Sequence, residues 1–140
     1  MSAKTYERVV LDTFAVLALL QGEPAAQRVA DVLSNGEPWM TLINLGEVTY
    51  IVERARGKAA ADTVFANLLA EQRPDGGKPI QWVPVDQKLV HRVASLKAAG
   101  GLSYADCFAA AAAAMLDCPV LTGDPEFAVA EQAGIVVEWL

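Results

Sequence analysis

The stretch from Leu102 to Phe127 constrains the fold of this chain most strongly. Ser103 is a favourable N-cap, and the run from Tyr104 to Leu116 is rich in alanine and contains neither Gly nor Pro, which predicts a helix. The short apolar run Pro119–Leu121 is typical of a buried parallel strand. A helix followed by such a strand predicts an α/β fold with a parallel sheet.

Two acidic residues of this stretch fall where an α/β sheet binds its ligands. Asp106 lies in the first turn of the predicted helix, and Asp124 follows the predicted strand directly before Pro125, which is placed to begin another helix. In open α/β sheets, ligands bind outside the carboxyl ends of the strands. Two carboxylates at that edge suggest a metal site.

The rest of the chain continues the alternation of strands and helices. We expect further strands at 9–11, 39–40, 80–83 and 135–137, and helices at 13–20, 24–35, 42–56, 59–71 and 86–99, with the clearest loop at 73–79. This order predicts a parallel sheet covered by helices on both faces, formed by residues 1–140 as a single domain.

Composition limits the kinds of function. The 140 residues are 54% apolar and carry a net charge of −6, which fits a globular protein and argues against broad, charge-driven binding to nucleic acid. No stretch reaches the roughly 18 apolar residues of a membrane span. Cys107 and Cys118 lack metal-ligand spacing, so we expect both to be small buried residues in a reduced, cytoplasmic protein.

Four carboxylates are expected at the carboxyl edge of the sheet, and we name them the acidic quartet: Asp12, Glu47, Asp106 and Asp124. Each also has an ordinary structural explanation. Asp12 and Asp124 are suitable helix caps, and Asp106 stands three residues after Ser103 as in a capping box. Glu47 sits close to the apolar face of its helix and can reach solvent from there.

The combination of the acidic quartet favours a metal. Two like charges about 4 Å apart repel by roughly 4 kcal/mol at an effective dielectric constant near 20. No Lys or Arg lies within two residues of any of the four acids. A divalent cation such as Mg²⁺ prefers hard oxygen ligands and promotes phosphoryl chemistry, so phosphodiester hydrolysis fits this set of residues best.

The remaining polar residues do not indicate a different enzymatic activity. His91 is the single histidine and is expected to be an ordinary surface residue of a helix. Arg54, Arg56 and Lys58 form a basic cluster at the end of the helix that carries Glu47. This cluster either complements the helix dipole or contacts phosphates of a substrate.

Several motifs together resemble a known family. These are Val10-Leu11-Asp12-Thr13, Glu47 within a helix, Ala105-Asp106 before an alanine run, and the segment 121–127. In order and spacing they resemble the PIN-domain family, and most closely its small VapC-type toxins. The resemblance implies a three-layer α/β/α sandwich with a parallel sheet of order 3-2-1-4-5. It also implies a Mg²⁺- or Mn²⁺-dependent endoribonuclease, usually a homodimer, that cleaves RNA and is inhibited by a cognate antitoxin.

Carried over by position, the acidic quartet would surround the metal, and Thr122 would be a neighbouring hydroxyl that orients Asp124 or a water molecule. One position departs from the family pattern. Phe14 stands where the family often has Ser or Thr, so that hydroxyl is absent, and Phe14 is expected to narrow the site or stack on a base.

The residues leave two alternative functions open. One is a catalytically silent PIN-like module that binds another protein. The other is a phosphatase of the haloacid dehalogenase type, whose chemistry requires a second acid at the position of Phe14.

Overall fold

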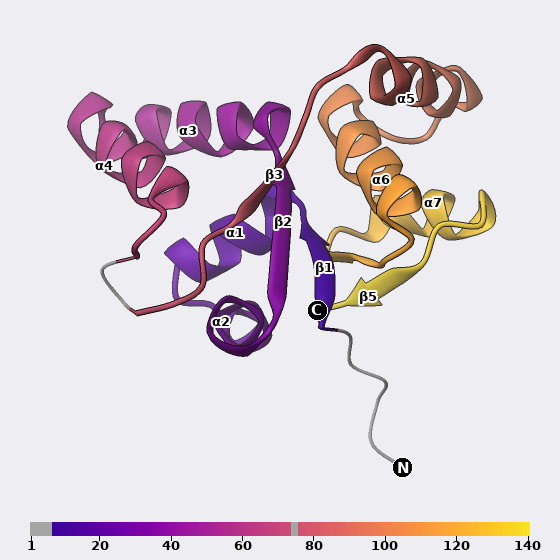
Figure 1. Ribbon diagram of the computed structural model, residues 1–140. Helices are drawn as coiled ribbons and strands as arrows, with labels where there is room; N and C mark the ends of the chain where they lie inside the picture. The colour runs from indigo at the N-terminus through magenta and orange to yellow at the C-terminus, as the bar shows by residue number, and fades with distance from the viewer. Residues whose placement is uncertain (1–6, 74–75) are drawn as a thin grey trace.

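The computed structural model describes residues 7–73 and 76–140 and contains a five-stranded sheet (Figure 1). All four strand pairings are parallel, and the strand order is β3-β2-β1-β4-β5, which confirms the predicted order. The strands are β1 (Arg8–Leu11), β2 (Glu37–Thr41), β3 (Gln81–Val83), β4 (Val120–Thr122) and β5 (Val137–Trp139).

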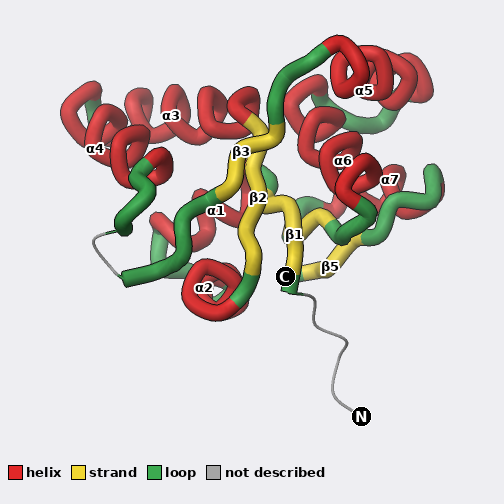
Figure 2. The backbone as a smooth tube through the Cα atoms, in the orientation of Figure 1, coloured by secondary structure: helices red, strands yellow, loops and turns green. Residues whose placement is uncertain are grey.

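Helices cover both faces of this sheet, so the described chain forms the predicted α/β/α arrangement (Figures 1 and 2). The first four helices lie on one side of the sheet and the later helices on the other. They are α1 (Thr13–Leu20), α2 (Ala26–Asn35), α3 (Leu42–Arg56), α4 (Lys58–Leu69), α5 (Gln87–Ala99), α6 (Tyr104–Leu116), the short 3-10 helix η1 (Pro125–Phe127) and α7 (Ala128–Gln132).

The strand residues alternate between two hydrophobic cores. In β1, Val10 packs toward the core formed with α5 and α6, while Val9 and Leu11 pack toward the core formed with α1 to α4. This alternation follows from the two-residue period of a strand. The alanine run 109–113 of α6 is fully buried, and its small side chains let this helix pack closely against the sheet.

Side-chain caps fix where four helices begin. Asp12 accepts a hydrogen bond from the Ala15 N–H at 2.8 Å, and Ser103 accepts one from the Asp106 N–H at 3.2 Å. Thr41 and Asp86 cap α3 and α5 in the same way. Each cap satisfies an N–H that has no partner within its own helix. Because α1 and α3 begin immediately after their strands, their first turns lie at the carboxyl edge of the sheet.

Several predicted boundaries need correction. The last strand begins at Val137 rather than at 135, because the buried Ile135 belongs to the turn that closes α7, where its N–H donates to the Ala130 carbonyl at 3.0 Å. The second strand is longer than predicted, α2 begins two residues after Pro24, and β4 ends at Thr122 rather than at Leu121. After Pro125 the chain forms a 3-10 turn before α7.

Two further expectations concern burial and loops. Cys107 is buried, but Cys118 is only half-buried, and both are free thiols. The predicted loop at 73–79 includes Pro74 and Asp75, which lie outside the described residues. Within the part of the chain that the structure describes, no helix is both long and apolar enough to cross a membrane.

Candidate metal centre

Asp12 is the most deeply buried member of the acidic quartet, with a relative exposure of 1%. It stands between β1 and α1, and its Oδ1 accepts the hydrogen bond from the Ala15 N–H. Its Oδ2 is also buried but has no hydrogen-bond partner of normal geometry among the described residues. Buried carboxylate oxygens are normally satisfied, so this atom is available to a ligand.

Three other carboxylates come together at the same edge of the sheet. One oxygen from each of Asp106, Asp124 and Glu126 lies within 4.8 Å of the other two. Asp106 is buried in the first turn of α6, Asp124 is half-buried after β4, and Glu126 is exposed in η1. Asp124 also caps η1 by accepting a hydrogen bond from the Glu126 N–H at 3.0 Å. The cap therefore draws Glu126 back beside Asp124.

The environment of Asp12 disfavours its charged form. Burial raises its pKa from 3.8 to about 7, and the nearby charges of Asp106 and Asp124 add to this increase. The Thr122 hydroxyl and the Ala15 N–H act in the opposite direction, but burial outweighs them. Asp12 is therefore linked electrostatically to two other members of the acidic quartet.

Asp106 is affected in the same way. Burial raises its pKa to about 6, and the charges of Asp124, Glu47 and Glu126 contribute further. The hydrogen bond with Ser103 acts in the opposite direction, but burial outweighs it. Glu47 is half-buried on α3 and lies outside the group of three carboxylates, but its charge acts on Asp106. The structure thus groups Asp106, Asp124 and Glu126, while Asp12 and Glu47 lie outside this group and are linked to it through their effects on pKa.

A family model describes most of this chain. The model of the PIN domain matches residues 9–132. The chain belongs to the PIN domain family. Its fold is also similar to solved structures of low sequence identity, and a search of curated proteins found no match.

Structures of VapC and VapBC proteins are among them. DNA-bound VapBC from Salmonella typhimurium is 15% identical with a TM-score of 0.70, over 96% of this chain and 98% of that chain. DNA-bound VapBC2 from Rickettsia felis is 14% identical with a TM-score of 0.69, over 94% and 97%. The sarcin–ricin loop cleaving toxin VapC20 from Mycobacterium tuberculosis is 18% identical with a TM-score of 0.68, over 94% and 99%. At these identities the likeness concerns the fold.

A buried amide in this PIN domain, Asn44, has contacts that no local sequence pattern predicts. Asn44 is fully buried in the first turn of α3, and its Nδ2 donates to the Thr13 hydroxyl at 3.3 Å and to the Ala105 carbonyl at 3.2 Å. The Thr41 hydroxyl donates to Asn44 Oδ1 at 2.5 Å. One side chain therefore connects α3 with the residues next to Asp12 and Asp106.

Two other side chains near the acids also have defined contacts. Thr122 Oγ1 accepts a hydrogen bond from the backbone N–H of Asp124 at 3.0 Å. Phe14, which stands in place of the expected Ser or Thr, lies with its ring against the backbone of Gly123. Glu126 was not predicted as a site residue, although its position two residues after Asp124 is visible in the sequence.

The predicted basic cluster is divided between two helices of the PIN domain. Arg54 and Arg56 are exposed in the last turn of α3, and the Arg54 guanidinium lies 5.2 Å from the ring centroid of Tyr50. Lys58 does not end this helix, because Gly57 terminates α3 and Lys58 begins α4. There it forms an exposed ion pair with Asp62 at 3.1 Å.

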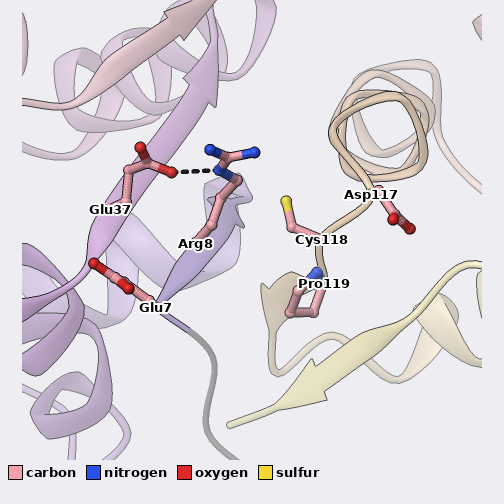
Figure 3. Close-up of a pocket in the computed structure, with 6 residues that line it drawn as sticks. All are labelled: Glu7, Arg8, Glu37, Asp117, Cys118 and Pro119. Carbon is pink, nitrogen blue, oxygen red and sulfur yellow. Dashed lines mark hydrogen bonds and ion pairs between the residues drawn. The ribbon is translucent and has the colours of Figure 1, made fainter.

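A pocket of about 440 Å³ lies at the opposite edge of the sheet (Figure 3). It is lined by Glu7, Arg8, Glu37, Asp117, Cys118 and Pro119. Arg8 begins β1 and Glu37 begins β2, so this is the amino edge, and the two side chains form an ion pair across the pocket wall. No member of the acidic quartet lines it.

Proposed function

We propose that this PIN domain is a metal-dependent endoribonuclease that hydrolyses phosphodiester bonds of RNA. The observation that carries the proposal is the uncompensated cluster of carboxylates at the carboxyl edge of the sheet. Within the described residues, no ion pair involves any member of the acidic quartet. A cluster of buried acids without cationic partners is costly unless a cation binds there.

The residues present fit a hard divalent cation. Carboxylate oxygens are the ligands that Mg²⁺ and Mn²⁺ prefer, and the buried Oδ2 of Asp12, which has no hydrogen bond of normal geometry within the described residues, offers one directly. We assign Asp12, Glu47, Asp106 and Asp124 as the residues that hold Mg²⁺ or Mn²⁺. When bound, such a cation supplies Lewis-acid activation and charge stabilisation for phosphodiester hydrolysis.

The chain's own residues define the geometry around this site. Asp12 and Asp124 are fixed as helix caps, so their carboxylates keep one orientation relative to β1 and β4. The Thr122 hydroxyl holds the backbone of Asp124, and we assign it an auxiliary role in orienting that carboxylate. Burial raises the pKa of Asp12 to about 7 and that of Asp106 to about 6, and a bound cation would favour the charged form of both carboxyl groups.

We further propose that the ribonuclease is the toxin of a toxin–antitoxin pair. The similar folds from Salmonella typhimurium and Rickettsia felis were solved as VapBC proteins, and the Mycobacterium tuberculosis protein is a toxin that cleaves the sarcin–ricin loop. On this proposal residues 1–140 form a single PIN-like domain that acts in the cytoplasm as a homodimer and is inhibited by a cognate antitoxin protein. Arg54, Arg56 and Lys58 are its proposed contacts with RNA phosphates.

An RNA cleavage assay tests the enzymatic proposal. Purified protein is incubated with single-stranded RNA in Mg²⁺, in Mn²⁺ or in EDTA, beside the Asp12→Asn variant. We expect cleavage that requires the metal and is lost in the variant, because Asn keeps the helix cap but removes a ligand charge. A folded protein that leaves RNA intact with either metal would instead favour the catalytically silent binding module.

A further inference from the structure

Phe14 is an exception within α1. Its neighbours Thr13, Ala15 and Val16 are buried, yet 36% of the surface of Phe14 is exposed. The residue lies in the first turn of α1, two positions after Asp12. An apolar ring is therefore presented at the carboxyl edge of the sheet, where the acidic quartet gathers.

The ring is supported by the backbone of Gly123. A Cβ atom on Gly123 would lie 2.4 Å from Phe14 Cε1 and 2.8 Å from Cζ, which is closer than real Cβ contacts allow. The backbone of Gly123 is outside the left-handed region, so its conformation does not itself require glycine. The absence of a side chain at Gly123 is what permits Phe14 to lie against this backbone.

Both residues of this contact adjoin members of the acidic quartet. Phe14 follows Asp12 by two residues, and Gly123 directly precedes Asp124. If a phosphodiester of RNA binds at these acids, a nucleotide attached to that phosphate would therefore lie beside the Phe14 ring. The ring packs against the backbone of Gly123, so it is already restricted in its rotation. Stacking of a base on this ring would therefore cost less side-chain conformational entropy than stacking on a freely rotating side chain.

We propose that Phe14 is a stacking platform for an unpaired RNA base next to the scissile phosphate. This inference rests on the proposed ribonuclease function and adds to it the residue that binds a base of the substrate. Aromatic stacking requires no positive charge and tolerates any base. That property suits a site whose nearest sequence neighbours include no Lys or Arg and whose protein carries a net charge of −6.

The exposure of the ring is also compatible with a contact to a partner protein. The location between two acids favours RNA, because an RNA phosphate must approach these acids for the proposed reaction. An apolar protein contact would be satisfied equally by any large aliphatic residue. Stacking demands an aromatic ring, so replacing Phe14 with Leu separates the two cases.

The test measures RNA binding without cleavage. In the Asp12→Asn background, affinity is measured for a single-stranded RNA that carries fluorescent 2-aminopurine, and for the same sequence in a duplex. We expect Phe14→Tyr to keep the affinity and the fluorescence quenching. Phe14→Leu should weaken single-strand binding by about 5- to 150-fold, the range for loss of one stacked base, and abolish the quenching. Gly123→Ala should weaken binding as well, because the added Cβ displaces the ring.

Controls distinguish this inference from the proposed function. Phe65→Ala removes an aromatic ring of similar exposure, 41%, from α4 and should leave the affinity unchanged. If the Phe14→Leu variant binds RNA as tightly as the Asp12→Asn protein that retains Phe14, the proposed stacking role is overturned, and the exposed ring is then a contact for a protein. If the wild type cleaves no RNA with either metal, the ribonuclease proposal fails independently of the stacking result.

Discussion

The acidic residues at the two edges of the sheet differ in their charge partners and in the direction in which their pKa values change. At the amino edge, Glu37 pairs with Arg8, and this partner lowers the pKa of Glu37. At the carboxyl edge, Asp12 and Asp106 have no such partner, and burial together with neighbouring acids raises their pKa values. At the first edge, the charge of Glu37 is therefore balanced by a cation of the chain itself. The second has charges that only a ligand can balance, which is why we place the function there although a pocket of about 440 Å³ lies at the other edge.

The largest expected effect is on catalysis at the carboxyl edge. Asp12→Asn, Glu47→Gln, Asp106→Asn and Asp124→Asn should each reduce RNA cleavage by about 100-fold or more, since each removes a charge from the proposed metal site. Glu37→Gln at the amino edge should leave cleavage unchanged. Cleavage rates at saturating Mg²⁺ provide the comparison. If Glu37→Gln and Asp106→Asn reduced the cleavage rate equally, the proposal that catalysis is confined to the carboxyl edge would be wrong.

The second effect is on stability and has a defined sign with pH. In the folded protein Asp12 and Asp106 have pKa values of about 7 and about 6, above the ordinary value of 3.8. The stability that these groups contribute is therefore fully present below about pH 4 and is lost as pH rises toward 7. The loss is on the order of several kcal/mol, since each pKa unit by which the two values exceed 3.8 corresponds to about 1.4 kcal/mol.

Melting curves in EDTA between pH 4 and pH 8 measure this loss. Asp12→Asn should flatten the decline and raise the melting temperature at pH 8, because it removes a buried charge and keeps the cap. If these acids were only helix caps, the variant would instead leave the pH dependence unchanged.

A smaller effect is expected from the amide that joins the acidic segments. Asn44→Ala leaves the buried Thr13 hydroxyl and Ala105 carbonyl without their partner, at a cost of about 1–3 kcal/mol in the free energy of unfolding. We also expect weaker metal binding, since the residues next to Asp12 and Asp106 lose their shared anchor. Val93→Ala, which creates a cavity in the core beside α5, is the matched control for lost stability. An Asn44→Ala protein with unaltered metal affinity would show that this amide serves folding alone.

The smallest effect concerns the basic residues at the end of α3. For a single strand, the slope of log affinity against log salt is about −0.7 per neutralised phosphate, so three or four contacts give a slope of roughly −2 to −3. Replacing Arg54 and Arg56 with Ala should flatten this slope and leave metal binding unaltered. RNA affinity of the Asp12→Asn protein over a salt series provides the measurement. If the slope stays the same, these arginines serve the helix end or a protein contact.

The sequence predicted the elements at the carboxyl edge well because their boundaries depend on local signals. Caps at Asp12, Thr41 and Ser103 and the break at Gly57 are short-range features, and each coincides with an observed helix boundary. The position of β5 was harder to predict, because Ile135 is as apolar as a strand residue but packs in the core from a turn.

The sequence could not predict how side chains distant along the chain meet. Asn44 contacts Thr13 and Ala105, which are 31 and 61 residues away, so no local pattern reveals the connection. The proximity of Glu126 to Asp106 likewise depends on the tight turn after Asp124. The raised pKa of Asp12 results from burial by several elements, which only the folded chain provides.

The central claim is that the carboxyl edge of the sheet holds a divalent cation, and direct titration of Mn²⁺ into the protein at pH 7.5 tests it. The measurement compares the wild type with Asp106→Asn and with Glu37→Gln. We expect saturable Mn²⁺ binding in the wild type and in Glu37→Gln, and binding weakened by at least tenfold in Asp106→Asn. Equal Mn²⁺ affinity in all three proteins, or none in the wild type, would contradict the account.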